Sequence, residues 1–241
     1  MGYPGLDTHG GLTSLGRLRI LGLSMSMRWR SSPPPAQRAA VLPALPTGTL
    51  ARRALKWSAD ASPPWLHAHV LRTYSWGRLL GEAAGLKPDD ELLFVACALH
   101  DLGLTERYAP DPGECFAFAG ARQARRLLEA EGVPAPWAAR VADAVVLHLE
   151  VDVALRRGVE AKLLHDGAAL DVLGLGGKSV TPEAKRAVLG AYSREGFGPL
   201  VADRLRAVAA NAPESRLAFF CRRIDFAGKA ARVRLPEEDA R

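Results

Sequence analysis

The sequence has no apolar run long enough to cross a membrane. Its longest such run, residues 92–99, falls far short of the roughly 20 residues that a spanning helix needs. Cysteine is also scarce: there are three, Cys97, Cys115 and Cys221, an odd number without CxxC spacing. This pattern excludes a disulfide framework and a thiolate zinc knuckle. We therefore expect a soluble protein of a reducing, cytoplasmic compartment with no membrane partner.

A concentrated basic surface is lacking as well. The formal net charge is +6, but residues 1–64 hold eight Lys and Arg against two Asp and Glu, which leaves 24 against 24 in the rest of the chain. A groove for a phosphate backbone needs basic residues clustered on one face of the folded domain. We therefore expect a small-molecule substrate and no nucleic-acid partner, and a homo-oligomer stays open.

The composition changes near residue 48. Residues 1–48 are interrupted by Gly, Ser and Pro, as in Ser31–Pro35, and contain no long periodic segment. We expect a disordered, poorly packed N-terminal extension there. Residues 49–230 suffice for one catalytic domain with one sizeable core, and residues 231–241 form a C-terminal tail.

Helical periodicity dominates from residue 50 onward. Apolar residues recur at the 3.6-residue period over 65–85, where Gly85 can end a helix. Asp89 can cap a second helix that contains residues 92–99, which are apolar on every side and belong at the centre of a bundle. No alternating strand pattern competes, so we expect an all-α bundle of seven to nine helices. The further expected helices span 119–131, 136–149, 158–173, 182–193, 198–211 and 214–226.

A histidine and an aspartate end the most apolar of these segments. His100 and Asp101 follow it directly, and Gly103 can stop the helix. Burying an imidazole and a carboxylate is costly unless something compensates for their desolvation. A bound cation is one such compensation, since both groups are ligands for Zn²⁺, Fe²⁺ or Mn²⁺. The alternative is a His-Asp pair that reaches the surface at a helix end.

Two other segments offer ligands for the same ion. His69 lies on the apolar stripe of its helix, and Arg72 follows one turn later on nearly the same side, where it could hold a substrate anion or a neighbouring carboxylate. A hydrogen-bonded core histidine is the alternative for His69. Asp171 shares a helix face with Leu164 and Ala168, and the small residues 167–169 would let the backbone approach another helix or a metal.

Several motifs, in this order and spacing, resemble the HD-domain superfamily and, within it, the cyanamide hydratase-like branch. They extend from about residue 60 to 225 and comprise His69-x-x-Arg72, His100-Asp101-Leu102-Gly103-Leu104-Thr105, and Gly167-Ala168 followed by Asp171-Val172-Leu173-Gly174. The resemblance implies a helical HD bundle in which His69, His100, Asp101 and Asp171 bind a divalent metal. It also implies a hydrolase or hydratase; cyanamide hydratase adds water to a nitrile carbon to give urea.

The chain departs from that branch at two places. Residues 116–121 read Phe-Ala-Phe-Ala-Gly-Ala where the branch often has Phe-Glu-Val-Asp-Gly-Ala, so two acids are missing. His148-Leu149-Glu150 stands where a polar Thr pair usually follows the histidine. If the missing acids contribute to a cyanamide pocket, cyanamide is not the substrate of this chain.

The expected mechanism uses one metal-activated water, with Asp101 or His148 moving the proton and Arg72 close by. Thr105 and Glu106 are further pocket candidates.

Three alternatives stay open. The first is a phosphohydrolase acting on nucleotides or phosphomonoesters, since Arg72 would suit a phosphate. The second is a dinuclear iron oxygenase with His148 and His165 as additional ligands. The third is a degenerate HD domain that only binds, against which the presence of all four candidate ligands argues.

Overall fold

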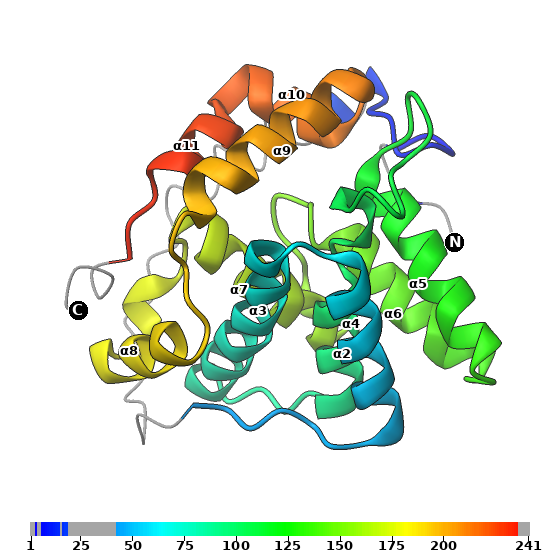
Figure 1. Cartoon of the computed structure of the whole chain (residues 1–241). Coiled ribbons are helices and arrows are strands. Elements are labelled where there is room, and N and C mark those ends of the chain that lie inside the picture. The colour runs from blue at the N-terminus through cyan, green and yellow to red at the C-terminus, as the bar shows by residue number, and fades with distance from the viewer. Residues whose placement is uncertain (1–2, 4–5, 15, 19–41, 236–241) are drawn as a thin grey trace.

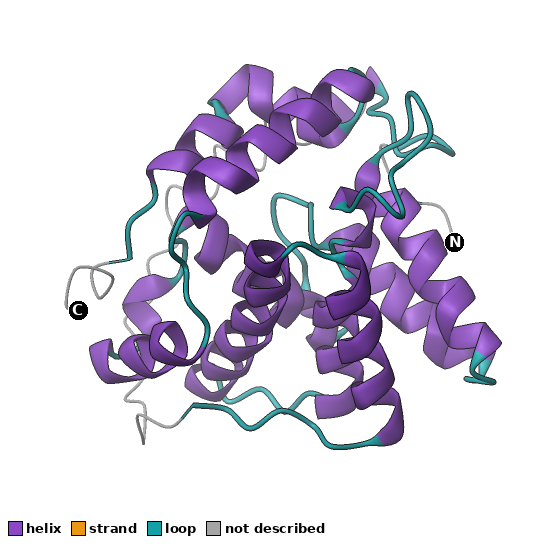
Figure 2. Cartoon of the chain, in the orientation of Figure 1, coloured by secondary structure: helices purple, strands orange, loops and turns teal. Residues whose placement is uncertain are grey.

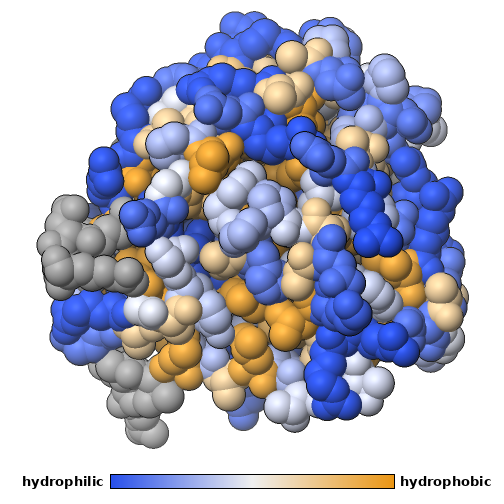
Figure 3. All heavy atoms as spheres, viewed as in Figure 1, coloured by the Kyte–Doolittle hydropathy of each residue, from blue (hydrophilic) through white to orange (hydrophobic). Residues whose placement is uncertain are grey.

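The computed structural model describes residues 3, 6–14, 16–18 and 42–235. Within these ranges every regular element is a helix, and the only strand-like pairings are two isolated bridges, Leu6 with Leu12 and Gly11 with Ser215 (Figure 2). The expected all-α fold is confirmed. None of the helices in the described ranges combines the length and apolarity required to span a membrane. On the face drawn in Figure 3, polar side chains predominate along the outer edge and apolar ones lie between them.

The α-helices follow one another along the chain with short connections. They are α2 (Thr49–Ala61), α3 (Pro64–Ala83), α4 (Asp90–Leu99), α5 (Phe116–Ala130), α6 (Ala135–Leu147), α7 (Val159–Leu173), α8 (Pro182–Ala191), α9 (Phe197–Asn211), α10 (Arg216–Ile224) and α11 (Phe226–Arg232). Three short 3-10 helices interrupt the loops, at Leu102–Leu104, Leu155–Arg157 and Gly177–Ser179.

The helices form a main bundle and an outer layer. In the bundle, α3 packs along α7 and α5 along α6, while α9, α10 and α11 lie together across one end of it (Figure 1). The outer layer has its own apolar cluster, which includes Phe197, Val201 and Leu217 and continues into the bundle through Leu66 and Phe116. Residues far apart in the chain therefore meet where the layer covers the bundle.

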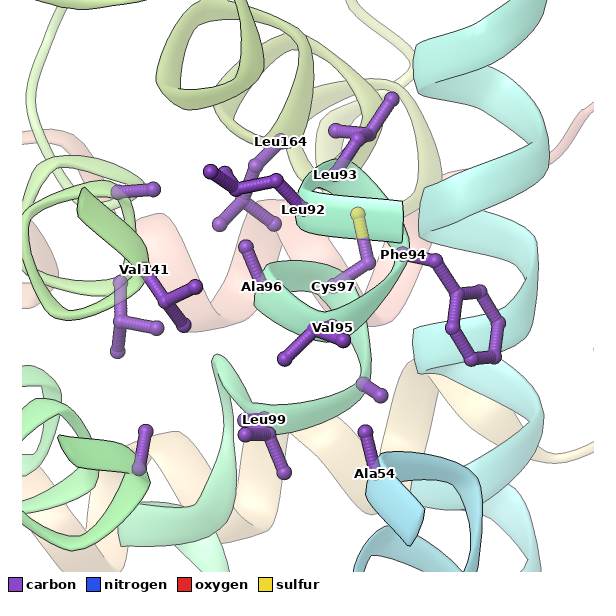
Figure 4. Close-up of a cluster of buried hydrophobic side chains, with 14 of the residues drawn as sticks. Ala54, Leu92, Leu93, Phe94, Val95, Ala96, Cys97, Leu99, Val141 and Leu164 are labelled. Atoms are coloured by element: carbon purple, nitrogen blue, oxygen red, sulfur yellow. The ribbon is translucent and has the colours of Figure 1, made fainter. Parts of the chain in front are cut away.

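Helix α4 is the centre of the bundle. Its N-terminus is capped by the Asp89 side chain, which accepts a hydrogen bond from the backbone N–H of Leu92 at 3.1 Å. All side chains from residue 92 to residue 99 are buried, and they contact helices on several sides (Figure 4). The prediction that this segment is buried on every face is confirmed. Its C-terminal end carries His100 and Asp101 into the interior.

Two glycines allow α3 and α7 to cross closely. A Cβ atom at Gly167 would lie 2.3 Å from the Thr73 carbonyl oxygen, and one at Gly77 would lie 2.8 Å from the Leu163 carbonyl oxygen. Neither contact is tolerable, so the glycine at 167 allows another helix to approach closely. Approach of a helix was one of the two roles expected for residues 167–169; approach of a metal was the other. The crossing also sets the position of Asp171, which lies one turn further along α7.

Gly167→Ala is expected to lower the free energy of unfolding by about 1–3 kcal/mol, because the added methyl forces the two backbones apart. Gly190→Ala on α8 is the matched control. A Cβ there meets nothing within 4 Å, and the change should stabilise by about 0.4–1 kcal/mol through the unfolded chain. Urea unfolding of both variants checks this. Equal stability of the two would contradict the close crossing.

The helix count and some boundaries differ from expectation. From Thr49 to Arg232 there are ten α-helices rather than seven to nine, because α2 and α11 were not foreseen as separate helices. The helix expected over 214–226 ends at Ile224, where Asp225 adopts a left-handed conformation with φ 51°. A left-handed residue other than glycine is uncommon, so this break could not be predicted from the residue type at position 225.

The expected poor packing of residues 1–48 does not hold for the part near residue 12. Leu12 is 7% exposed, its backbone N–H donates to the Glu214 carbonyl at 2.8 Å, and the Cys115 N–H donates to the His9 carbonyl at 3.0 Å. Tyr3 hydrogen-bonds Asp143 through its hydroxyl. These contacts are largely made by the backbone, which leaves no pattern in the sequence. Leu42 and Leu45 also pack against apolar clusters. The other residues of the expected extension, 1–2, 4–5, 15 and 19–41, lie outside the described residues.

Candidate metal centre

Three candidate ligands converge at the end of α4. His69 comes from α3, His100 caps the C-terminus of α4, and Asp101 follows it. Their nearest ligand atoms lie within 4.8 Å of one another, and the residues are 1%, 1% and 6% exposed. Among the described residues this is the one group of three or more His, Cys, Asp or Glu residues with metal-binding spacing. The separation of about 30 residues in sequence is closed by the packing of α3 on α4.

Gly103 lets the chain leave α4 sharply after the pair. A Cβ at this position would lie 2.0 Å from the Phe116 carbonyl oxygen. The 3-10 turn Leu102–Leu104 therefore presses against the start of α5, and Arg204 of α9 donates from Nε to the Leu104 carbonyl at 2.5 Å. These contacts fix the backbone that carries Asp101.

The hydrogen bonds of the two histidines assign their tautomers. His100 Nδ1 lies 2.8 Å from the Cys97 carbonyl oxygen, which can only accept, so this nitrogen carries the proton. His69 Nδ1 lies 2.7 Å from Asp171 Oδ2, which holds the proton there as well. In the neutral rings both Nε2 atoms are then unprotonated, and they lie 3.4 Å and 3.2 Å from Asp101 Oδ2. Two lone pairs facing a carboxylate repel one another unless a cation lies between them.

The pKa shifts of His69 and Asp101 also favour a cation at this site. Burial lowers the pKa of His69, but its hydrogen bonds to Asp101 and Asp171 outweigh that and raise the pKa overall. Burial raises the pKa of Asp101, yet His100 and His69 hold it well below its usual range. The surroundings thus stabilise a positive charge at His69 and an ionised Asp101. Imidazole nitrogens and a carboxylate oxygen are suitable donors for Zn²⁺, Fe²⁺ or Mn²⁺, so these residues fit such an ion.

Asp171 is fully buried on the far side of the His69 ring. Besides His69 it accepts hydrogen bonds from Arg72 Nε at 2.8 Å and from Trp76 Nε1 at 2.9 Å. Arg72 and His69 together hold its pKa below the usual range against the effect of burial. Both carboxylate oxygens therefore face protein donors. The structure brings Asp171 to the site as expected, and its role as a metal ligand stays a prediction.

Arg72 is also fully buried, with its guanidinium directed at the carboxylate. It donates from Nε and Nη2 to Asp171, and from Nη1 to the Ser193 carbonyl at 2.6 Å. Of the two contacts foreseen for Arg72, a substrate anion or a neighbouring carboxylate, the structure shows the second. Arg194 adds a hydrogen bond from Nη2 to the backbone carbonyl of Asp171 at 2.8 Å.

His148 approaches the other oxygen of Asp101. Its Nε2 lies 3.7 Å from Asp101 Oδ1, and its ring meets that of His100 edge to face with centroids 4.9 Å apart. His148 Nδ1 donates to the Val145 carbonyl, so Nε2 is the unprotonated nitrogen. Burial, followed by the charge of His100, lowers the pKa of His148 to about 3. A neutral imidazole with a free lone pair therefore faces the candidate ligand.

The remaining candidates lie further out. His165 Nδ1 donates to the His148 carbonyl at 3.0 Å, so this ring supports the His148 backbone. Asp166, which follows His165 on α7, pairs with Lys162 at 2.7 Å. The Thr105 hydroxyl donates to the Leu102 carbonyl at 2.7 Å within its own turn, and Glu106 is exposed.

Aromatic rings cover the site, and the sequence did not signal them. The Phe197 ring stacks on His69 with centroids 4.9 Å apart and planes 22° apart, while the Arg72 and Arg194 guanidinium carbons lie 4.8 Å and 5.1 Å from its centroid. Phe116 meets His148 edge to face at 5.7 Å. Apolar walls exclude water and strengthen electrostatic interactions inside the site.

Comparison with known proteins agrees with this geometry. A search of curated proteins found no match to the chain. The family model described as HD domain matches residues 66–187. The matched segment runs from α3 into α8 and includes His69, His100, Asp101, His148 and Asp171. Because the match covers just over half of the sequence, the chain belongs to the HD domain family.

Proposed function

We propose that this protein is a metal-dependent hydrolase or hydratase that uses one divalent ion, held by His69, His100 and Asp101, to direct water at a small-molecule electrophile. The observation that carries the proposal is the convergence of the His69 and His100 Nε2 atoms on the Asp101 carboxylate in a buried site, while both Nδ1 atoms are engaged by the protein. Membership of the HD domain family, which consists largely of metal-dependent hydrolases, supports it.

The ion would supply an activated water, because a bound divalent metal lowers the pKa of water towards about 7. The chain's own residues supply the proton transfer. His148 is neutral, its Nδ1–H is fixed by the Val145 carbonyl, and its Nε2 lies 3.7 Å from Asp101 Oδ1. It is therefore placed to accept a proton beside Asp101. Asp171 and Arg72 orient His69 through its other ring nitrogen.

For the substrate we propose a small uncharged electrophile, such as a nitrile, with cyanamide as one candidate. The phosphohydrolase alternative relied on Arg72 as the phosphate partner, and this guanidinium already contacts Asp171 and the Ser193 carbonyl. The rings of Phe197 and Phe116 next to the histidines also suit an apolar or uncharged group better than a phosphate. Phosphomonoesters are the substrates against which nitriles are compared in the assay.

One observation supports the dinuclear alternative. Asp101 directs Oδ2 at the His69–His100 pair and Oδ1 at His148, so the two carboxylate oxygens face different histidines and His148 would be the residue to hold a second ion. His165, which this alternative offers as an optional further ligand, donates from Nδ1 to the His148 carbonyl. Metal stoichiometry decides, because one ion per chain supports the proposal and two iron ions per chain support the alternative.

The test is reconstitution of metal-free protein. The chelated protein is reloaded with Zn²⁺, Fe²⁺ or Mn²⁺ and assayed on cyanamide, other small nitriles and phosphomonoesters. We expect turnover of a nitrile that rises with metal content up to one ion per chain. Undiminished activity in the metal-free protein would contradict the proposal. Failure to take up any metal would favour the binding-module alternative.

His148→Ala is expected to keep the metal and to slow turnover by about 10²- to 10⁴-fold, because a positioned proton acceptor is lost. Metal content and rate are measured on the same preparation. His67→Ala is the control, since His67 lies on the other side of α3 and hydrogen-bonds Ser58 at 3.1 Å. If His148→Ala instead loses a metal ion, His148 is a metal ligand, and this result supports the dinuclear alternative.

A further inference from the structure

Arg216 links the outer layer of helices to the end of α6. It is the first residue of α10, and it lies beyond the segment that the family model matches. Its side chain is fully buried. Nη2 donates to the Val146 carbonyl at 2.7 Å, and Nη1 donates to Glu150 Oε1 at 2.7 Å. One guanidinium therefore holds two points of the chain on either side of His148.

The same end of α6 holds the His148 ring. The last carbonyls of a helix have no partner within it, and here they are satisfied by side chains: Val145 accepts from His148 Nδ1 and Val146 accepts from Arg216. The turn closes with a hydrogen bond from the Glu150 N–H to the Leu147 carbonyl at 2.9 Å. Loosening this turn would weaken the hydrogen bond from His148 Nδ1 to the Val145 carbonyl and let the ring turn away from Asp101.

Stability alone explains this arrangement poorly. Arg216 buries a charge, and its Nε has no hydrogen-bond partner among the residues that the structure describes, which is costly in a protein interior. Buried ion pairs are often replaced by apolar residues without loss of stability. A buried charge held at such cost is better explained by the two segments of chain that it positions.

We propose that Arg216 is a positioning residue for His148, holding the end of α6 so that His148 Nε2 faces Asp101. The outer layer is then part of the catalytic apparatus, although it lies outside the matched HD segment. The catalytic importance of this His148 position rests on the function proposed above, in which His148 accepts a proton. The placement itself can be measured without turnover.

The experiment is NMR of protein labelled with ¹⁵N at histidine, recorded without metal and with Zn²⁺. The chain has six histidines, so His148 can be assigned by its loss in His148→Gln. We expect a single Nδ1–H tautomer for His148 in the natural protein. In Arg216→Met/Glu150→Gln, which removes both charges, this signal should be lost or averaged between tautomers, while the His69 and His100 signals stay. Arg216→Lys should give an intermediate result, because one ammonium cannot reproduce the planar fork.

Arg222→Met is the matched control, since Arg222 lies on the exposed side of the same helix and bonds the Pro213 carbonyl; it should leave His148 unchanged. A folded double variant with an unaltered His148 signal would overturn the proposal. So would failure of both Arg216 variants to unfold cooperatively, because Arg216 would then serve the fold. If Zn²⁺ does not bind at all, the proposed function fails, while the metal-free spectra still report on Arg216.

Discussion

Asp101→Ala is expected to lose the bound metal and to reduce turnover by about 10³-fold or more, because several kcal/mol of charge stabilisation disappear with the ion. Asp101 is the one carboxylate within the His69–His100–Asp101 group. Without it, two neutral imidazoles would have to hold a divalent cation in a buried site, where charges interact strongly and are poorly screened. Metal affinity should therefore fall together with the rate.

The fold should survive this substitution. Asp101 lies beyond the end of α4, and the apolar residues 92–99 carry the packing of that helix. Metal content and rate are measured on the same preparation, with circular dichroism to check the helices. Asp166→Ala is the control, because this carboxylate pairs with Lys162 away from the cluster. Full activity in Asp101→Ala would contradict the proposal that activity depends on a metal ion held by Asp101.

Asp171→Ala is expected to have the largest effect on stability, about 3–5 kcal/mol, because it leaves the Arg72 guanidinium buried without its anion. Arg72 is fully buried and directs Nε and Nη2 at this carboxylate. Asp203→Ala, which removes an exposed partner of Arg206, should change stability by less than about 0.5 kcal/mol. Denaturant unfolding of the two variants gives the comparison, and equal effects would contradict the role of the buried pair.

The same carboxylate should also affect the metal through His69. Removing a group that orients a ligating histidine costs about 10- to 100-fold in metal affinity. The double variant Asp171→Leu/Arg72→Met removes both charges, so it should recover much of the stability while metal binding stays weak. A complete loss of metal, equal to that of Asp101→Ala, would instead assign Asp171 as a ligand, as the family resemblance predicted.

The parts of this site that the sequence predicted are those with a local pattern. The 3.6-residue stripe placed His69 inward, and the apolar run before His100 and Asp101 placed that pair in the interior. The glycine at 167 signalled a close approach, which α3 fulfils. Each of these inferences used residues within a few turns of one helix, where geometry follows directly from spacing.

The parts that the sequence did not predict depend on contacts across the fold. Phe197 covers His69 from a helix more than 120 residues away in the chain, and Arg216 reaches the end of α6 from the outer layer. Neither residue belongs to a motif or a distinctive spacing. Trp76 lies on the same helix as His69 and Arg72, yet its indole could equally have been an apolar core residue until Asp171 was placed beside it.

The metal centre is tested most directly by titrating metal-free protein with Zn²⁺ and following the binding by calorimetry and by ¹⁵N-histidine NMR. We expect saturation at one ion per chain, with the Nε2 resonances of His69 and His100 shifted on binding and both Nδ1–H groups kept. The His148 ring should stay in its Nδ1–H tautomer without ligating the ion. Absence of binding, or binding that leaves His69 and His100 unchanged, would contradict the account.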